Sequence, residues 1–160
     1  MTDQARNGTV VGVIGLGNAG YAVASAFAKL SPVHGYDLNG DKRTSASQRG
    51  IITHNQFDAF TAAIDIAIMS LPHPDISLAV TGQLLDLESR PKLIIDTSTV
   101  TPQTAIDCAS LTSAYGVGFV DAAIAGGVAS MADGQTTFFM GGDDASKAMA
   151  KTVLEPVAAG

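Results

Sequence analysis

Three glycines with the spacing G-x-G-x-x-G lie close to the start of the chain, at Gly15, Gly17 and Gly20. Each would serve a phosphate ligand differently. Gly15 permits a tight turn, Gly17 leaves no side chain between the backbone and a pyrophosphate, and Gly20 lets a helix pack closely on a strand. The N–H groups at the helix start would then point at an anion. The loop predicted to hold the pyrophosphate of a dinucleotide comprises Gly15, Leu16, Gly17, Asn18, Ala19 and Gly20.

An acidic residue follows this loop at the distance expected for a ribose contact. Asp37 lies about 20 residues beyond the glycines, where an acceptor for the adenosine ribose hydroxyls belongs. A carboxylate there binds the 2′-hydroxyl and repels a 2′-phosphate, so it predicts NAD rather than NADP. Lys42 and Arg43 come next and could attract a phosphate. We interpret them instead as solvated residues of the following helix.

The elements around these residues are those that a dinucleotide loop needs. Residues 10–14 form an apolar, β-branched run typical of a buried strand, and the Ala-rich segment 19–28 is typical of a helix. Residues 33–36 predict a second strand that ends at Asp37. A strand, turn and helix that bind nothing would share part of this pattern. The acidic residue and the glycine spacing together favour nucleotide binding.

Further along the chain, short apolar runs alternate with stretches that favour helices. This alternation predicts an α/β fold, a doubly wound parallel sheet of the Rossmann type in three αβα layers. The length of 160 residues predicts one domain over residues 1–160. The expected strands are 10–14, 33–36, 51–53, 66–71, 93–95, 117–120 and 136–140.

Capping residues and prolines predict where the helices begin. Asn39 or Asp41 can cap the helix after the second strand, and Asp143 can cap the last one. Pro74 and Pro102 suit the first turn of a helix.

Ligands of such sheets bind beyond the carboxyl ends of the strands, and polar or glycine residues follow several of them. His73 could act as an acid–base group or contact a ribose, but we favour a solvent-facing loop histidine because no carboxylate is adjacent to it. Asp121 is expected to end the sixth strand near a substrate, or to cap a turn. Gly126 and Gly127, in a Gly-rich loop over 122–134, either offer bare N–H groups to a carboxylate or form a flexible bend.

The sequence lacks the patterns typical of metal sites and of serine hydrolases. No histidine pair has i, i+4 spacing and Cys108 is the single cysteine, so no metal site is expected. The G-x-S-x-G motif of serine hydrolases is absent.

Composition limits the partners and the compartment. The net charge is −6 and no basic stripe exists, which argues against nucleic acid. Residues 1–7 are polar and do not resemble a signal peptide, and no apolar run is long enough to cross a membrane. The lone Cys108 excludes an internal disulfide, so we expect a cytoplasmic protein.

Four segments, taken in order, resemble the β-hydroxyacid dehydrogenase family, whose best-known members are 3-hydroxyisobutyrate dehydrogenases. The likeness covers almost the whole chain and implies an NAD-binding domain. Leu71, Pro72 and Thr99 would line the nicotinamide side, and Ser98, Gly126 and Gly127 would meet a substrate carboxylate. The segments are VIGLGNAG at 13–20, LP at 71–72, DTSTVTP at 96–102 and DAAIAGG at 121–127 with Gly141-Gly142 after it.

The chain departs from the family in two respects. Ala125 replaces a serine that helps to hold the substrate carboxylate, and Ala123 replaces a proline. The family also continues into a helical domain whose lysine, in a G-x-x-x-K-x-x-N pattern, moves the substrate proton. The chain stops at Gly160 before that pattern, and Lys151 lacks it. The resemblance therefore implies no catalytic residue within residues 1–160.

We expect an NAD-dependent dehydrogenase domain for a small 3-hydroxyacid, inactive in isolation, with homo-oligomerisation of a full-length form left open. A stand-alone NAD-sensing module is the alternative. A methyltransferase is less favoured, because no acidic residue stands just before Gly15 in the strand.

Overall fold

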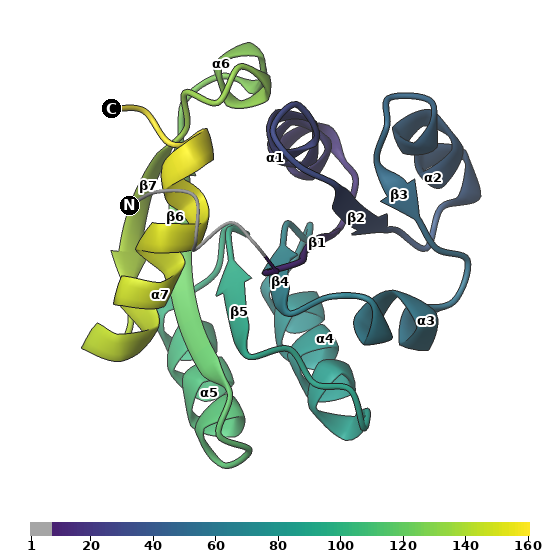
Figure 1. Ribbon diagram of the computed structural model, residues 1–160. Helices are drawn as coiled ribbons and strands as arrows, with labels where there is room; N and C mark the ends of the chain where they lie inside the picture. Colours follow the sequence, from purple (N-terminus) through teal and green to yellow (C-terminus); the bar gives the residue numbers. More distant parts are fainter. Residues whose placement is uncertain (1–7) are drawn as a thin grey trace.

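The computed structural model describes residues 8–160, which form one seven-stranded sheet with helices on both faces (Figure 1). The prediction about residues 1–7 lies outside this range. The strands are β1 (Val11–Ile14), β2 (Val33–Tyr36), β3 (Ile52–Thr53), β4 (Ile66–Met69), β5 (Leu93–Asp96), β6 (Gly118–Ala125) and β7 (Thr137–Gly141). The helices are α1 (Asn18–Ala28), α2 (Gly40–Ser47), α3 (Phe57–Ala62), α4 (Pro74–Asp86), α5 (Pro102–Ser113), α6 (Val128–Ala132) and α7 (Asp144–Leu154), followed by the 3₁₀ turn η1 (Glu155–Val157).

The strand order is β3-β2-β1-β4-β5-β6-β7, and β1 to β6 run parallel. The order reverses between β1 and β4, which makes that point the topological switch of a doubly wound sheet. The predicted Rossmann-type fold is confirmed. One strand differs from the expectation, because β7 pairs antiparallel with β6. The short connection over 126–136 leaves β6 and enters β7 at the same end of the sheet, so the chain reverses its direction instead of making a crossover.

The two faces of the sheet carry separate cores. One core packs α1, α2 and α7 on alternate strand residues such as Val13, Ile68 and Ile95. The other packs α3, α4 and α5 on the intervening residues, such as Ala67 and Ile94. The central strands are buried on both faces, which explains their continuous apolar sequence.

The predicted helix starts are confirmed at four positions. The side chain of Asn39 accepts from two N–H groups of α2, and that of Asp143 accepts from Ser146 N–H of α7. Pro74 and Pro102 open α4 and α5. No helix within 8–160 is long and apolar enough to cross a membrane.

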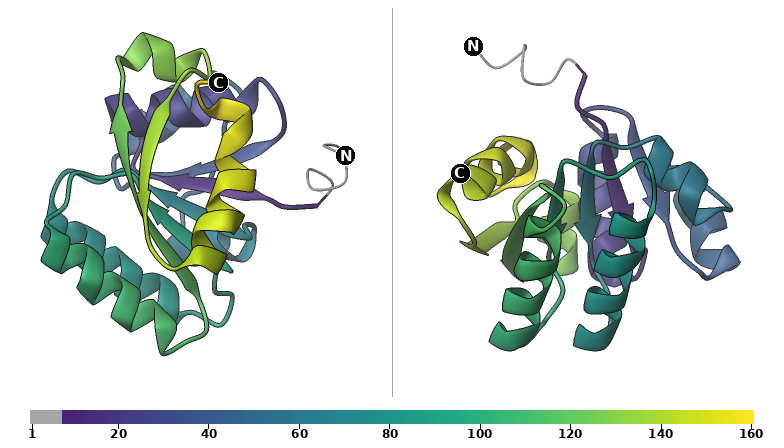
Figure 2. Two further views of the ribbon diagram at one scale, coloured as in Figure 1. Left: turned by 90° about the vertical axis from the view of Figure 1, so that its left-hand side faces the viewer. Right: turned by 90° about the horizontal axis from the view of Figure 1, so that it is seen from below.

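β6 is longer than the sequence predicts. We expected it to stop at residue 120 and Asp121 to end it, but it runs to Ala125 with Asp121 inside it. Asp121 pairs with Asp96, the last residue of β5, so the four residues after it extend past the carboxyl end of β5. There they pair with β7, which runs antiparallel beside β6 (Figure 2). The first four residues of the expected loop over 122–134 therefore belong to β6, and the loop also contains α6.

Candidate functional site

Parallel strands bring the predicted site residues to one edge of the sheet. The glycine loop is tied to both neighbouring strands, because Gly15 N–H donates to Tyr36 O and Ser70 N–H donates to Ile14 O, each over 2.8 Å. The N–H of Leu16 donates to Oδ2 of Asp37, also over 2.8 Å. The loop after β1 is thus fixed in place.

The structure separates the roles of the three glycines. A methyl group on Gly15, whose φ is +92°, would overlap the backbone of Ser70, and one on Gly20 would overlap the carbonyl oxygen of Gly15. A methyl group on Gly17 would meet no protein atom within 4 Å. The fold itself therefore requires Gly15 and Gly20, whereas the space beside Gly17 is open.

The start of α1 beside that space is also open. Gly17 occupies the cap position and no side chain of the described residues accepts a hydrogen bond from the first turn. By contrast, α2, α4, α5 and α7 each begin with a side-chain cap. The first N–H groups of a helix need partners and carry the positive end of its dipole. The start of α1 can therefore receive an anion, as a pyrophosphate requires.

A hollow of about 440 Å³ lies between this loop and α2. Sequence reasoning identified its Leu16, Gly17 and Asn18 wall. In the remaining wall it considered only Lys42, which it interpreted as solvated. That wall comes from the N-terminal parts of α1 and α2, which tertiary packing brings together. Its residues are Tyr21, Asp41, Lys42 and Ser45.

Asp37 stands at the end of β2, half-buried, with both carboxylate oxygens engaged by the backbone. Oδ2 accepts from Leu16 and Oδ1 accepts from Asn39 N–H over 2.8 Å. Each oxygen has a second lone pair that can accept a hydroxyl. Arg43 is not simply solvated: its Nη1 donates to the carbonyl oxygens of Asp37 and Leu38 over 2.7 and 3.1 Å. Its guanidinium therefore steadies the backbone at Asp37.

The loops after β4 and β5 are joined to each other. Thr97 donates to Met69 O through both its N–H and its hydroxyl, over 2.8 and 2.7 Å. The N–H of Leu71 donates to Oγ of Ser98 over 2.8 Å. Pro72 and Thr99 are exposed and Leu71 is half-buried, but Ser98 is buried. The predicted nicotinamide-side residues thus lie together, and the Ser98 hydroxyl is already hydrogen-bonded within the protein.

Two carboxyl groups lie side by side beneath these loops. Asp96 is fully buried, and burial raises its pKa, while nearby groups of Ser98 and Ser77 act in the opposite sense. Asp121 is its neighbour on β6. Burial, and then the charge of Asp96, raise the pKa of Asp121.

His73 caps α4, a role the sequence prediction missed. Its Nδ1 accepts from Asp75 N–H at 3.3 Å and lies 3.7 Å from the Asp75 carboxylate. The sequence contained a signal for this role, because the carboxylate of Asp75 lies two residues after His73; the sequence analysis considered only the adjacent residue. The side chain is 63% exposed, as the prediction of a solvent-facing histidine requires.

Gly126 and Gly127 lie beyond the sheet edge, between β6 and α6. Gly126 has φ +132°, a conformation that favours glycine, and Gly127 is the cap residue of α6. α6 packs beside α1 (Figure 1). Lys29 Nζ holds it there, donating to Ala132 O over 2.7 Å and to Asp133 over 3.2 Å. Both glycines are exposed.

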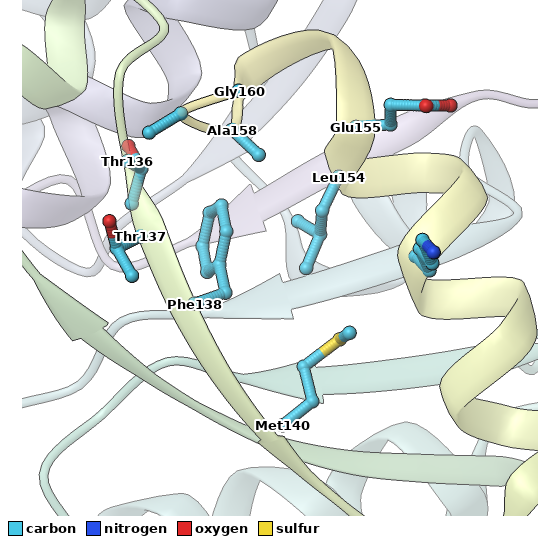
Figure 3. Close-up of a pocket in the computed structure, with 10 residues that line it drawn as sticks. Thr136, Thr137, Phe138, Met140, Leu154, Glu155, Ala158 and Gly160 are labelled. Carbon is cyan, nitrogen blue, oxygen red and sulfur yellow. The ribbon is translucent and has the colours of Figure 1, made fainter.

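A second hollow, of about 340 Å³, lies between β7, which is an edge strand, and the α7–η1 segment (Figure 3). Phe138, Met140 and Leu154 contribute apolar surface to it. None of the predicted site residues lines it. Within residues 8–160 no group of three or more His, Cys, Asp or Glu side chains could hold a metal ion.

Comparison with known proteins gives a family match and several relatives. The family model described as the NAD binding domain of 6-phosphogluconate dehydrogenase matches residues 10–160. A probable 3-hydroxyisobutyrate dehydrogenase of Mycobacterium tuberculosis is 27% identical over 151 residues, 94% of this chain and 51% of that protein. The 3-hydroxyisobutyrate dehydrogenase of Pseudomonas aeruginosa is 30% identical over 92% of this chain and 51% of its own length.

Solved structures agree. That of Mycobacterium tuberculosis 3-hydroxyisobutyrate dehydrogenase with L-serine superposes with a TM-score of 0.86 at 29% identity. The match covers 94% of this chain and 52% of that one. The chain therefore spans about half the length of the relatives that it matches.

Proposed function

The chain belongs to the NAD-binding domain family of 6-phosphogluconate dehydrogenase, and from this premise we propose that it binds NAD as the cofactor domain of a dehydrogenase for a small 3-hydroxyacid. The open space at Gly17 carries this proposal. The fold does not need a glycine there, yet a side chain would fill the space in front of the uncapped start of α1. A pyrophosphate needs both the open space and the free N–H groups.

The adenosine ribose would lie at Asp37. Its two oxygens keep lone pairs beside those that accept from the backbone, so they can take the ribose hydroxyls. A 2′-phosphate would meet this carboxylate at close range, which favours NAD over NADP. The remaining cofactor contacts in the loop would come from Gly15, Leu16, Asn18, Ala19 and Gly20.

The nicotinamide would lie over the joined loops after β4 and β5. Leu71, Pro72 and Thr99 would form its wall, and the hydrogen bond from Leu71 to Ser98 keeps that wall in place. When bound, NAD supplies the hydride acceptor, and the protein supplies position.

A substrate carboxylate would meet the exposed N–H groups at Gly126 and Gly127. Ser98 would line this site with its backbone, since its hydroxyl accepts a hydrogen bond from Leu71 N–H. Ala123 and Ala125 are exposed at alternate positions of β6 and so share one face of the strand. A methyl group at Ala125 offers no hydrogen bond to a substrate, so contacts made with the backbone carry more weight.

The proton acceptor for the substrate hydroxyl would come from outside residues 1–160, in a helical domain like that of the resembling family. Lys151 lies on α7 beside the second hollow, away from the glycine loop. Residues 1–160 would then form the cofactor domain alone. A non-catalytic NAD-sensing module is the second candidate, because the same observations at Gly17 support cofactor binding without turnover.

An absorbance assay for NADH separates the two candidates. The chain is saturated with NAD and given 3-hydroxyisobutyrate, first alone and then joined to the helical half of a relative such as the Pseudomonas aeruginosa enzyme. NADH formation by the joined protein supports the dehydrogenase. NAD binding without turnover by the joined protein supports the sensing module.

A further inference from the structure

The carboxyl group of Asp96 has an environment that the fold alone does not explain. Asp96 ends β5 and is fully buried. Oδ1 accepts from Ser98 N–H over 3.0 Å, and Oδ2 has no hydrogen-bond partner. No cation among the described residues forms an ion pair with it. A buried carboxyl group with an unused oxygen destabilises a fold, so its presence needs another reason.

Asp96 lies at the base of a continuous set of hydrogen bonds. It accepts from the backbone of Ser98, and the Ser98 hydroxyl accepts from Leu71 N–H over 2.8 Å. Thr97, between Asp96 and Ser98, donates twice to Met69 O just below Leu71. The carboxyl group thereby fixes how the loop after β5 holds the loop after β4.

The groups around Asp96 are polar or acidic. Asp121 lies beside it on β6, and Ser77 approaches it from α4 with a hydroxyl that also lacks a hydrogen-bond partner. Cys108 on α5 is near enough for the charge of Asp96 to raise its pKa, and its sulfur accepts from the Thr81 hydroxyl. None of these groups supplies a positive charge.

We infer that Asp96 is a positioning residue, which acts through Ser98 to hold Leu71 against the nicotinamide half of the cofactor. The inference rests on the proposed function, because it takes Leu71 as part of the nicotinamide wall. In this inference Ser98 has two roles: it links Asp96 to Leu71 by hydrogen bonds, and it lines the substrate site. Asp96 itself touches neither cofactor nor substrate.

Two ligands that differ only in the nicotinamide test the inference. NAD uses both halves of the site, whereas ADP-ribose uses only the glycine loop and Asp37. Calorimetric titration of each ligand gives, for every variant, the ratio of the affinity for NAD to the affinity for ADP-ribose. Asp96→Ala should lower the affinity for NAD about tenfold and leave that for ADP-ribose within about twofold, the loss expected for one hydrogen-bonded contact. Asp96→Asn, whose amide oxygen can still accept from Ser98, should restore most of the ratio.

Asp65→Ala is the matched control. Asp65 Oδ2 also accepts from a backbone N–H, that of Val10, over 2.8 Å, but at the opposite end of the sheet. This variant should lose stability and keep the ratio of affinities. Ser98→Ala removes the acceptor of Leu71 N–H and should lower the ratio as Asp96→Ala does. It decides the question if Asp96→Ala does not fold.

An unchanged ratio in Asp96→Ala, or in Ser98→Ala where the first variant does not fold, would overturn the inference while leaving NAD binding intact. A ratio that falls equally in Asp65→Ala would also overturn it. If the unmutated chain binds ADP-ribose and NAD equally well, Leu71 is not at a nicotinamide wall. The inference then fails together with the proposed nicotinamide wall, while NAD binding at the glycine loop and Asp37 stands. If it binds neither ligand, the proposed function itself fails.

Discussion

At the scale of single residues, the glycine loop shows which demands come from the fold and which from a ligand. Gly15 and Gly20 are enclosed by backbone atoms, so packing alone requires them. Gly17 faces open space. The sequence pattern predicts all three positions equally well, but it cannot separate these reasons, because the atoms that enclose Gly15 and Gly20 include Ser70, which directly follows β4.

Gly17→Ala should abolish most NAD binding and change the free energy of unfolding by no more than about 1 kcal/mol, the usual difference between glycine and alanine at a helix cap. The new methyl group meets no protein atom within 4 Å but would enter the space proposed for the pyrophosphate. Calorimetry and urea unfolding measure the two effects. Gly20→Ala is the control and should fail to fold stably. Normal NAD affinity in Gly17→Ala would mean that the loop holds no phosphate.

Asp37→Ala should weaken NAD binding and narrow the preference over NADP. The variant removes the carboxylate that would accept from the ribose and oppose a 2′-phosphate. It also removes the bond from Leu16, so some loss for both cofactors is expected. Titrations with NAD and NADP measure the change. The assignment is wrong if the ratio of the two affinities stays the same.

At the scale of elements, the sequence predicts strands well where both faces of the strand are buried. It predicts them poorly where only pairing with a neighbouring strand makes the segment extended. β4 and β5 are continuous apolar runs, and the structure buries them on both faces. The second half of β6 contains three alanines, which have little strand preference of their own. Pairing with β7 makes this segment a strand. The sequence predicts β7 as a strand, but no local signal shows that it pairs with these residues.

The edge strand β3 brings a histidine pair together that the sequence did not indicate. Nδ1 of His34 on β2 and Nε2 of His54 after β3 lie 2.8 Å apart. Burial lowers the pKa of both, and for His34 the charge on His54 lowers it further. The folded state therefore binds fewer protons than the unfolded state at pH values just below 6.5, so stability falls as the pH drops through that range.

Replacing both residues, with His34→Gln and His54→Gln, should reduce the stability that the protein loses as the pH falls. Urea unfolding at about pH 8 and about pH 5 measures it, since these values bracket the ordinary histidine pKa. The interpretation fails if the double variant and the unmutated protein lose the same stability on acidification.

At the scale of the whole molecule, the topology assembles the site. The order of strands reverses between β1 and β4, so the glycine loop and the Leu71 loop lie side by side at the switch point. The sequence predicts this edge, because any parallel sheet gathers the carboxyl ends of its strands. It could not predict the reach of β6 beyond that edge, the far wall of the hollow at Gly17, or the burial of the Ser98 hydroxyl, all of which depend on packing between distant segments.

Residues 1–160 alone should form no NADH from 3-hydroxyisobutyrate, although they bind NAD. Hydride transfer from an alcohol needs a group within hydrogen-bond reach that takes the hydroxyl proton, and the resembling family supplies a lysine from another domain. Absorbance at saturating NAD measures the rate, with a full-length relative as the positive control. Robust turnover by this chain would contradict the account and make His73 the foremost acid–base candidate.

The most direct test of NAD binding is a calorimetric titration of the unmutated chain with NAD and, separately, with NADP at one salt concentration. The account predicts one-to-one saturation by NAD and markedly weaker binding of NADP, because the Asp37 carboxylate, proposed to hold the ribose, would oppose a 2′-phosphate. Absence of NAD binding, or equal affinity for the two cofactors, would contradict it.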